Sequence, residues 1–121
     1  MISPKNVVLN YRAQQVYSAG PIQRLLMVYD VAITACNSRD LKRLTEALNL
    51  LRGTLDFDQG DVAIRLYSLY QYTNDQARDG KWDEAARVLR ELVKAWVEVL
   101  VRETDRRSGP VFVQRSLSLA G

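Results

Sequence analysis

Three acidic side chains stand close together in the stretch LDFDQGD, which runs from Leu55 to Asp61. Asp56, Asp58 and Asp61 have the oxygen ligands and the short spacing of a calcium-binding loop. Such a loop needs glycine at its sixth position and a bidentate acid at its twelfth, whereas Asp61 and Tyr67 stand there. We therefore predict no metal site, and we expect these aspartates to cap the following helix and to favour the positive end of its dipole.

Groups for nucleophilic or acid–base chemistry are otherwise few, because the chain has no histidine and a single cysteine. The missing histidine excludes Ser–His and Cys–His catalysis, the Glu-x-x-His di-iron pattern and ordinary zinc sites. Cys36 lies among Ala32, Ile33 and Ala35 on a predicted apolar face, so we expect a buried structural thiol and no intramolecular disulfide. We expect no catalytic residue and no cofactor. A small enzyme subunit with undetected acid chemistry stays open as an alternative, although no carboxylate stands on an apolar helical face.

The composition is that of one soluble globular domain, with 47% hydrophobic and 26% charged residues in a chain of 121. The net charge is +3 and the two signs are interspersed, so we expect no nucleic-acid partner. No apolar run approaches the roughly 18 residues that cross a bilayer, and no cleavable leader opens the chain. We therefore expect a cytoplasmic protein without membrane insertion.

Glycine and proline divide the chain into four segments with helical periodicity and almost no strand-like alternation. The dividing residues are Gly20-Pro21, Asn37-Ser38, Gly60, Gly80 and Ser108-Gly109-Pro110. This pattern predicts an all-α protein, an antiparallel four-helix bundle with short loops. Residues 1–19 then form a short N-terminal capping segment and 20–104 the helical bundle. Residues 105–121 form a flexible C-terminal tail whose role is open.

Local signals predict where the helices begin and end. Pro21 suits the first position of a helix, with Gly20 as its N-cap. Ser38 and Asp61 are the expected start signals of the second and third helices. Gly80 is placed to end the third.

The apolar faces of the four helices differ in width. The second helix has a narrow stripe that one neighbour can cover, whereas the apolar residues of the fourth fill about half of its circumference. The first helix has one face that runs from Ile22 to Cys36, while Met27 and Val31 begin a second face on the opposite side. An exposed valine or leucine forgoes about 1.5–3 kcal/mol. Either the first helix is buried on all sides within the bundle, or it lines a groove for another chain.

The stretch NYRAQQVYSAGP that leads into the first helix is too short to be a stable helix by itself. Tyr11, Gln15 and Val16 lie on one side of it and can pack against the bundle. We therefore expect a weakly held N-terminal cap over the apolar groove, which a partner can displace.

Four stretches carry a resemblance to a known family: YRAQQV, SAGPIQRLLMVYDVAI, LDFDQGDVAIRLYSLYQY and LRELVKAW. In this order, from about Asn10 to Trp96, they resemble the FliS family of flagellin-specific export chaperones. The resemblance implies a non-enzymatic, mostly antiparallel helical bundle that binds the disordered C-terminal region of flagellin. It also implies that the protein keeps this amphipathic region from premature polymerisation in the cytoplasm and delivers it to the flagellar type III export gate.

The chain departs from the family pattern at several positions. Gly20 stands where the family has serine, Val31 where it has glycine, and Gln59-Gly60 where it has Gly-Gly. The span from Ile33 to Leu48 is shorter than in typical members, which would trim the first helical hairpin. The stretch GKWDEAARVLREL is similar to the second helix of a tetratricopeptide repeat, so a general helical interaction module or another secretion chaperone remains the alternative. Whether the chain forms a homo-oligomer stays open.

The face widths and the resemblance together predict a partner-binding surface on the first and fourth helices. We expect it to consist of Ile22, Leu25, Leu26 and Tyr29 with Val93, Trp96, Val97 and Leu100. Tyr11, Gln15 and Val16 form its removable N-terminal cap.

Overall fold

The computed structural model describes residues 20–107, and this part of the chain is entirely helical apart from its turns. In chain order the elements are α2 (Pro21–Asn37), α3 (Leu41–Gly53), the 3₁₀ helix η1 (Phe57–Gln59), α4 (Asp61–Arg78) and α5 (Trp82–Arg107). The predicted four-helix fold is confirmed. Tyr11, Gln15 and Val16, with the rest of the predicted cap, lie outside the described residues.

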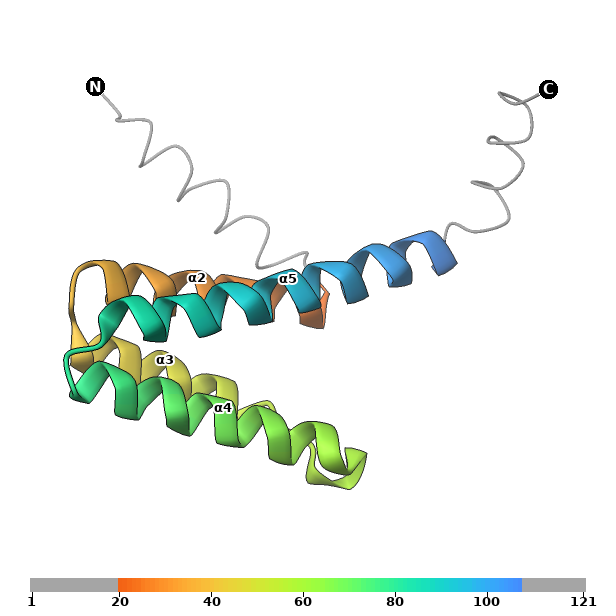
Figure 1. Ribbon diagram of the computed structural model, residues 1–121. Coiled ribbons are helices and arrows are strands. Elements are labelled where there is room, and N and C mark those ends of the chain that lie inside the picture. Colours follow the sequence, from red (N-terminus) through yellow and green to blue (C-terminus); the bar gives the residue numbers. More distant parts are fainter. Residues whose placement is uncertain (1–19, 108–121) are drawn as a thin grey trace, which may run out of the picture.

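The four α-helices form a ring in which each packs against its two neighbours in the chain order, and α2 closes the ring against α5. Figure 1 shows that consecutive helices run in opposite directions, as expected of an antiparallel bundle. The α2–α3 and α4–α5 turns lie at one end of the bundle, here called the closed end. The connection through η1 lies at the other, the open end, where α5 also continues beyond the start of α2 (Figure 1).

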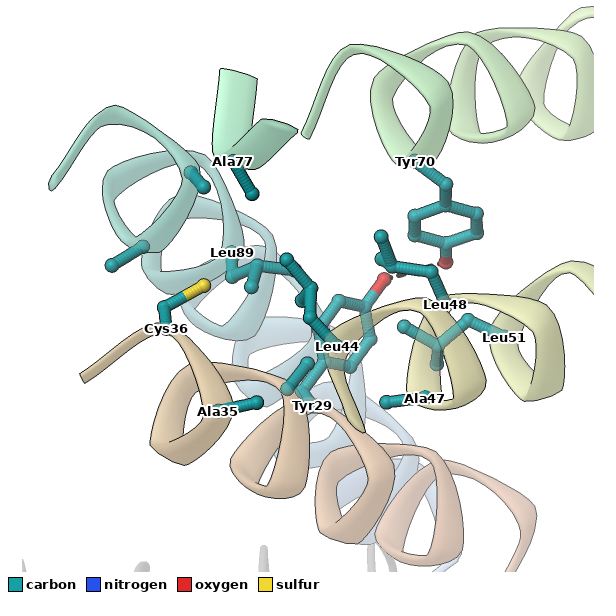
Figure 2. Packing of buried hydrophobic residues seen from close by; sticks show 13 residues of the cluster. Tyr29, Ala35, Cys36, Leu44, Ala47, Leu48, Leu51, Tyr70, Ala77 and Leu89 are labelled. Atoms are coloured by element: carbon teal, nitrogen blue, oxygen red, sulfur yellow. Dashed lines mark hydrogen bonds between the residues drawn. The ribbon is translucent and has the colours of Figure 1, made fainter. Parts of the chain in front are cut away.

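The two helix pairs, α2 with α5 and α3 with α4, diverge from the closed end toward the open end (Figure 1). The buried side chains at the closed end include the small residues Ala35, Ala77 and Ala85, which let the backbones approach closely. Toward the open end the core contains Tyr29 and Tyr70, which need more room (Figure 2). The gradient in side-chain size along the core accounts for the taper, because protein interiors are close-packed at every level.

The turn between α2 and α3 corrects one predicted helix start. Asp40, not Ser38, caps α3, and its carboxylate accepts a hydrogen bond from the backbone N–H of Arg43 at 3.1 Å. Ser38 instead donates its hydroxyl back to the carbonyl of Thr34 at 3.0 Å and so belongs to the end of α2. Both are good cap residues, and the tight turn decides between them.

Arg39 occupies the middle of this turn with a φ of 54°, in the left-handed region. Its backbone N–H donates to the carbonyl of Cys36 at 3.1 Å, and that of Asp40 donates to Ala35 at 2.8 Å. This bonding pattern is a Schellman motif, in which glycine is the usual left-handed residue. The α2–α3 turn is therefore made with an arginine at a position that costs it conformational energy.

The α3–α4 connection and the end of α4 show the other predicted caps. The Asp56 carboxylate accepts a hydrogen bond from the backbone N–H of Asp58 at 3.0 Å, so Asp56 caps η1. The prediction that it caps α4 is wrong. Gly60 precedes α4, and Asp61 places its carboxylate in the first turn, at the positive end of the helix dipole. Gly80, with a φ of 80°, follows Asp79, the C-cap of α4, so the predicted end is confirmed.

The last turn of α5 also differs from the expectation, since the helix continues through Arg107 instead of ending near Thr104. Apolar periodicity stops there, but no glycine or proline follows until Gly109. The polar residues in this stretch can extend a helix without burying a face.

A charged cluster joins α4 to α5 near the closed end. Tyr72 donates its hydroxyl to the Glu84 carboxylate at 2.6 Å, and Arg87 makes two hydrogen bonds to the same carboxylate. Arg87, and to a smaller extent Tyr72, lower the pKa of Glu84 to about 2 from its ordinary 4.5. The cluster therefore favours the ionised form of this carboxyl in the folded protein.

Replacing Arg39 by glycine should stabilise the fold by about 0.5–1 kcal/mol, because glycine adopts the left-handed conformation without a Cβ clash. Urea denaturation followed by helical circular dichroism measures this change. Arg43→Gly is the matched control within α3 and should destabilise by about 1 kcal/mol. Equal destabilisation by both substitutions would contradict the assigned conformation of the turn.

Glu84→Gln should destabilise the protein at pH 6, and the difference from the parent chain should shrink as the pH falls. The folded state favours the ionised carboxyl, so this contribution is complete above pH 4.5 and is lost as the pH approaches 2. Urea denaturation at pH 6, 4 and 3 measures it. Glu98→Gln, on the same helix, is the control. A difference that stays constant over this pH range for Glu84→Gln would refute the role of the cluster.

Candidate ligand-binding surface

Four hollows surround α2, and this helix contributes side chains to each of them. The α2–α3 hollow has a volume of about 770 Å³ and the end hollow, at the open end, about 480 Å³. The α2–α5 hollow measures about 250 Å³, and the rim hollow, between the start of α2 and the last turns of α5, about 220 Å³.

Neighbouring hollows share lining residues, so they form one connected belt. Met27 lines both the α2–α5 and the α2–α3 hollow. Arg24 and Val28 line both the α2–α3 and the end hollow, and Ile22 lines both the end and the rim hollow. The surface round α2 is therefore continuous and passes along two sides of the helix.

The end hollow lies at the open end of the bundle, where the two helix pairs diverge and apolar side chains line the space. Its walls come from α2, α4, α5 and the connection between α3 and α4, and they are mostly apolar, with polar groups from Arg24, Thr54, Asp56 and Gln59. The apolar residues are Pro21, Ile22, Leu25, Val28, Leu55, Val62, Ala63, Leu66, Tyr70 and Trp96. This composition suits apolar side chains presented by an amphipathic segment.

The α2–α3 hollow has an apolar floor between charged groups. Met27, Val28 and Val31 of α2 face Ala47 and Leu50 of α3, and Leu50 is 63% exposed. Basic and acidic side chains both line this hollow: Arg24, Lys42, Arg43, Asp40 and Glu46. The mixed charges give the hollow no strong preference for one sign of ligand.

The residues predicted from the sequence are distributed over three of these hollows. Ile22, Leu25 and Trp96 line the end hollow, and Leu100 lines the rim hollow with Ile22. The α2–α5 hollow contains the other three exposed or half-buried members of the set: Leu26, Val93 and Val97. The structure thus places seven of the eight predicted residues on the belt.

Tyr29, the eighth predicted residue, lies in the core with no exposed surface. Its hydroxyl oxygen is 2.6 Å from that of Tyr70 and accepts a hydrogen bond from the indole Nε1 of Trp96 at 3.1 Å. Burial, with the adjacent Tyr70, raises the pKa of Tyr29 well above its ordinary value. This tyrosine stays neutral, and its hydroxyl contacts Tyr70 and Trp96, which both line the end hollow.

Sequence reasoning found the second apolar side of α2 but not the hollow that this side forms with α3. Met27 and Val31 gave the signal for it, while Leu50 lies outside the Leu44, Leu48 and Leu51 stripe and was not recognised. It also missed Val62 and Leu66 of α4, which stand four residues apart and line the end hollow.

Cys36, the single cysteine of the chain, lines none of the four hollows. Cys36 is buried as predicted, and burial raises the pKa of its thiol to about 11, which keeps it protonated. Among residues 20–107 no cluster of three or more histidine, cysteine, aspartate or glutamate side chains is arranged for a metal ion. No helix within the same residues has the length and apolarity to cross a membrane.

A helical bundle with adjoining, mostly apolar hollows is typical of proteins that bind apolar or amphipathic segments of other chains. The chain matches the family described as "Flagellar protein FliS" over residues 4–103, and it belongs to that family. Proteins of this family are non-enzymatic chaperones, and membership implies a role in the export of flagellin. Comparison with curated proteins and with solved structures gave no match.

Proposed function

We propose that this protein binds the amphipathic C-terminal region of flagellin in the cytoplasm, prevents its premature polymerisation and delivers it to the flagellar type III export gate. The family supports flagellin as the ligand. The observation that carries the proposal is the connected belt round α2, because it offers apolar contacts on more than one side of a single helix.

The shape of the belt suits a ligand made of several short amphipathic segments. Each hollow accepts a few apolar side chains, and the shared residues Met27, Val28 and Ile22 join one hollow to the next. A disordered chain can follow such a path and fold as it binds, covering a large surface. A single straight helix would reach only one side of α2.

In this proposal the contacts fall to the predicted residues on the belt. Leu26, Val93 and Val97 receive one segment between α2 and α5. Ile22, Leu25, Trp96 and Leu100 receive another at the open end. Met27, Val31 and Leu50 extend the surface toward α3. The interaction is carried by apolar burial, and Asp30 is the one acidic residue among those that line the α2–α5 hollow.

The N-terminal segment is proposed to cover part of this surface until flagellin binds. Gly20, the first described residue, lines the rim hollow, which shares Pro21 and Ile22 with the end hollow. A segment that joins the bundle at this point has both hollows within reach, and Tyr11, Gln15 and Val16 supply apolar and polar contacts for it. We expect the segment to be displaced without unfolding the bundle.

Val97→Asp should weaken binding of a flagellin C-terminal fragment by about tenfold or more, because it places a charge among apolar contacts. Val97 is 40% exposed in the free protein, so the fold should be little affected. Isothermal titration calorimetry at several temperatures measures the affinity, and a ligand that folds on binding should give a large negative heat-capacity change.

Ala95→Asp is the matched control, because it introduces the same charge at an exposed position of α5 outside the belt. It should leave the affinity within about twofold of the parent chain. The proposal would be refuted by a flat titration with the parent protein. Equal weakening by Val97→Asp and Ala95→Asp would instead place the contact elsewhere.

Deleting residues 1–17 should raise the fluorescence of a dye that binds exposed apolar surface, while the helical circular dichroism changes little. The deletion removes Tyr11, Gln15 and Val16 but leaves the described bundle whole. Addition of the flagellin fragment should then lower the signal by displacing the dye. An unchanged dye signal after the deletion would rule out the cap.

A further inference from the structure

The open end of the core contains a chain of three aromatic side chains from three helices. Trp96 of α5 donates its indole N–H to the hydroxyl of Tyr29 on α2, at 3.1 Å. The Tyr29 hydroxyl lies 2.6 Å from that of Tyr70 on α4, and their rings are tilted by 55° with centroids 6.2 Å apart (Figure 2). These three hydrogen-bonded aromatic side chains therefore connect the α2–α5 pair to α4 of the other pair.

Two members of this chain line the end hollow and the third lies behind them. Trp96, which is half-buried, and Tyr70, which has no exposed surface, contribute to its wall, whereas Tyr29, also without exposed surface, does not line it. Within the described residues, the side-chain hydrogen bonds of Trp96 and of Tyr70 both go to the Tyr29 hydroxyl. Removing this hydroxyl would therefore remove one hydrogen bond from each of these two side chains.

The two hydrogen bonds can be removed with little change in packing. Phenylalanine at position 29 or 70 has nearly the shape of tyrosine but lacks the hydroxyl, so either substitution tests the bonds themselves.

We propose that Tyr29 is a positioning residue whose hydroxyl fixes the Trp96 and Tyr70 side chains as a preformed wall of the end hollow and thereby sets the affinity for the flagellin segment bound there. This inference rests on the proposed function. It assigns Tyr29 a role behind the surface, where it acts through two other residues. A preformed wall strengthens binding because the side chains need not be ordered when the ligand arrives.

The test compares Tyr29→Phe with the parent chain in two measurements, using a flagellin C-terminal fragment as the probe. The chain has two tryptophans, so a nitrogen–proton NMR spectrum shows two indole signals, and Trp82 serves as an internal reference outside the four hollows. In free Tyr29→Phe the Trp96 indole proton should shift upfield and exchange faster with solvent, while the Trp82 signal stays in place. Calorimetry should show an affinity about two- to tenfold lower.

Tyr67→Phe is the matched control. Tyr67 lies on the same helix as Tyr70 but is 45% exposed, and its hydroxyl makes no hydrogen bond in the described part of the chain. It lines none of the four hollows. Its removal should change neither the Trp96 signal nor the affinity.

The possible results distinguish a positioning role of Tyr29 from a purely structural one, and both from a failure of the proposed function. An unmoved Trp96 signal in Tyr29→Phe, or a moved signal with unchanged affinity, would overturn the positioning role while leaving flagellin binding by the parent chain intact. No binding by the parent chain would overturn the proposed function and this inference with it. A lower melting temperature with unchanged affinity would show a merely structural tyrosine.

If Tyr29→Phe does not fold, Tyr70→Phe decides the matter. It keeps the bond from Trp96 to Tyr29 and removes only the link to α4. The Trp96 signal should then move less, and the affinity should still fall by about two- to tenfold. Unchanged affinity in Tyr70→Phe would overturn the inference.

Discussion

The structure depends on one constraint, which is that α2 carries more apolar surface than its two neighbours can cover. Only Tyr29, Ala32, Ala35 and Cys36 of this helix are buried, and three of these four are small. Its larger apolar side chains are half-buried or exposed, and Val31 is 38% exposed. Each valine or leucine left exposed forgoes about 1.5–3 kcal/mol of folding free energy. This loss is large for a small bundle with a modest core. An apolar surface retained at this cost is typical of a binding site.

The closed end and the open end of the bundle differ in the contacts that join the helices. At the closed end the helices meet through alanines such as Ala35 and Ala85, and the charged cluster of Tyr72, Glu84 and Arg87 ties α4 to α5. The helix pairs diverge toward the end of the core that contains Tyr29 and Tyr70 (Figures 1 and 2). The end hollow is lined by residues of α2, α4, α5 and the α3–α4 connection. The charged cluster and the end hollow therefore lie at opposite ends of the same helices.

Local sequence signals located the four helices but not the cap of α3, the cap of η1 or the end of α5. Pro21 and Gly80 mark their positions because each restricts or frees the backbone whatever surrounds it. Ser38 and Asp40 are both capping residues, so the choice between them follows from the left-handed Arg39, which no residue preference predicts. Asp56 caps η1 for a similar reason, since a short 3₁₀ helix has no periodicity to reveal it.

The candidate site shows the same division between what periodicity fixes and what packing decides. Helical spacing put Ile22, Leu25 and Tyr29 on one face of α2 but not at one depth, and only the tertiary fold makes Tyr29 internal and the others part of the belt. The depth matters for the chemistry of binding. A ligand that meets Ile22 and Leu25 gains apolar contacts directly, whereas Tyr29 can influence it only through Trp96 and Tyr70.

Apolar contacts and a fixed wall also suit a binding protein that must release what it binds. The hollows are shallow and spread over several sides of α2, so the free energy of binding is divided among many modest contacts. Most of the lining of the end and α2–α5 hollows is apolar, so under the proposed function a segment that leaves either hollow gives up mainly apolar contacts. Under the proposed function, a bound segment that detaches from one hollow exposes only the few side chains lining it. Release can then proceed hollow by hollow along the belt, which avoids one large barrier when flagellin is handed to the export gate.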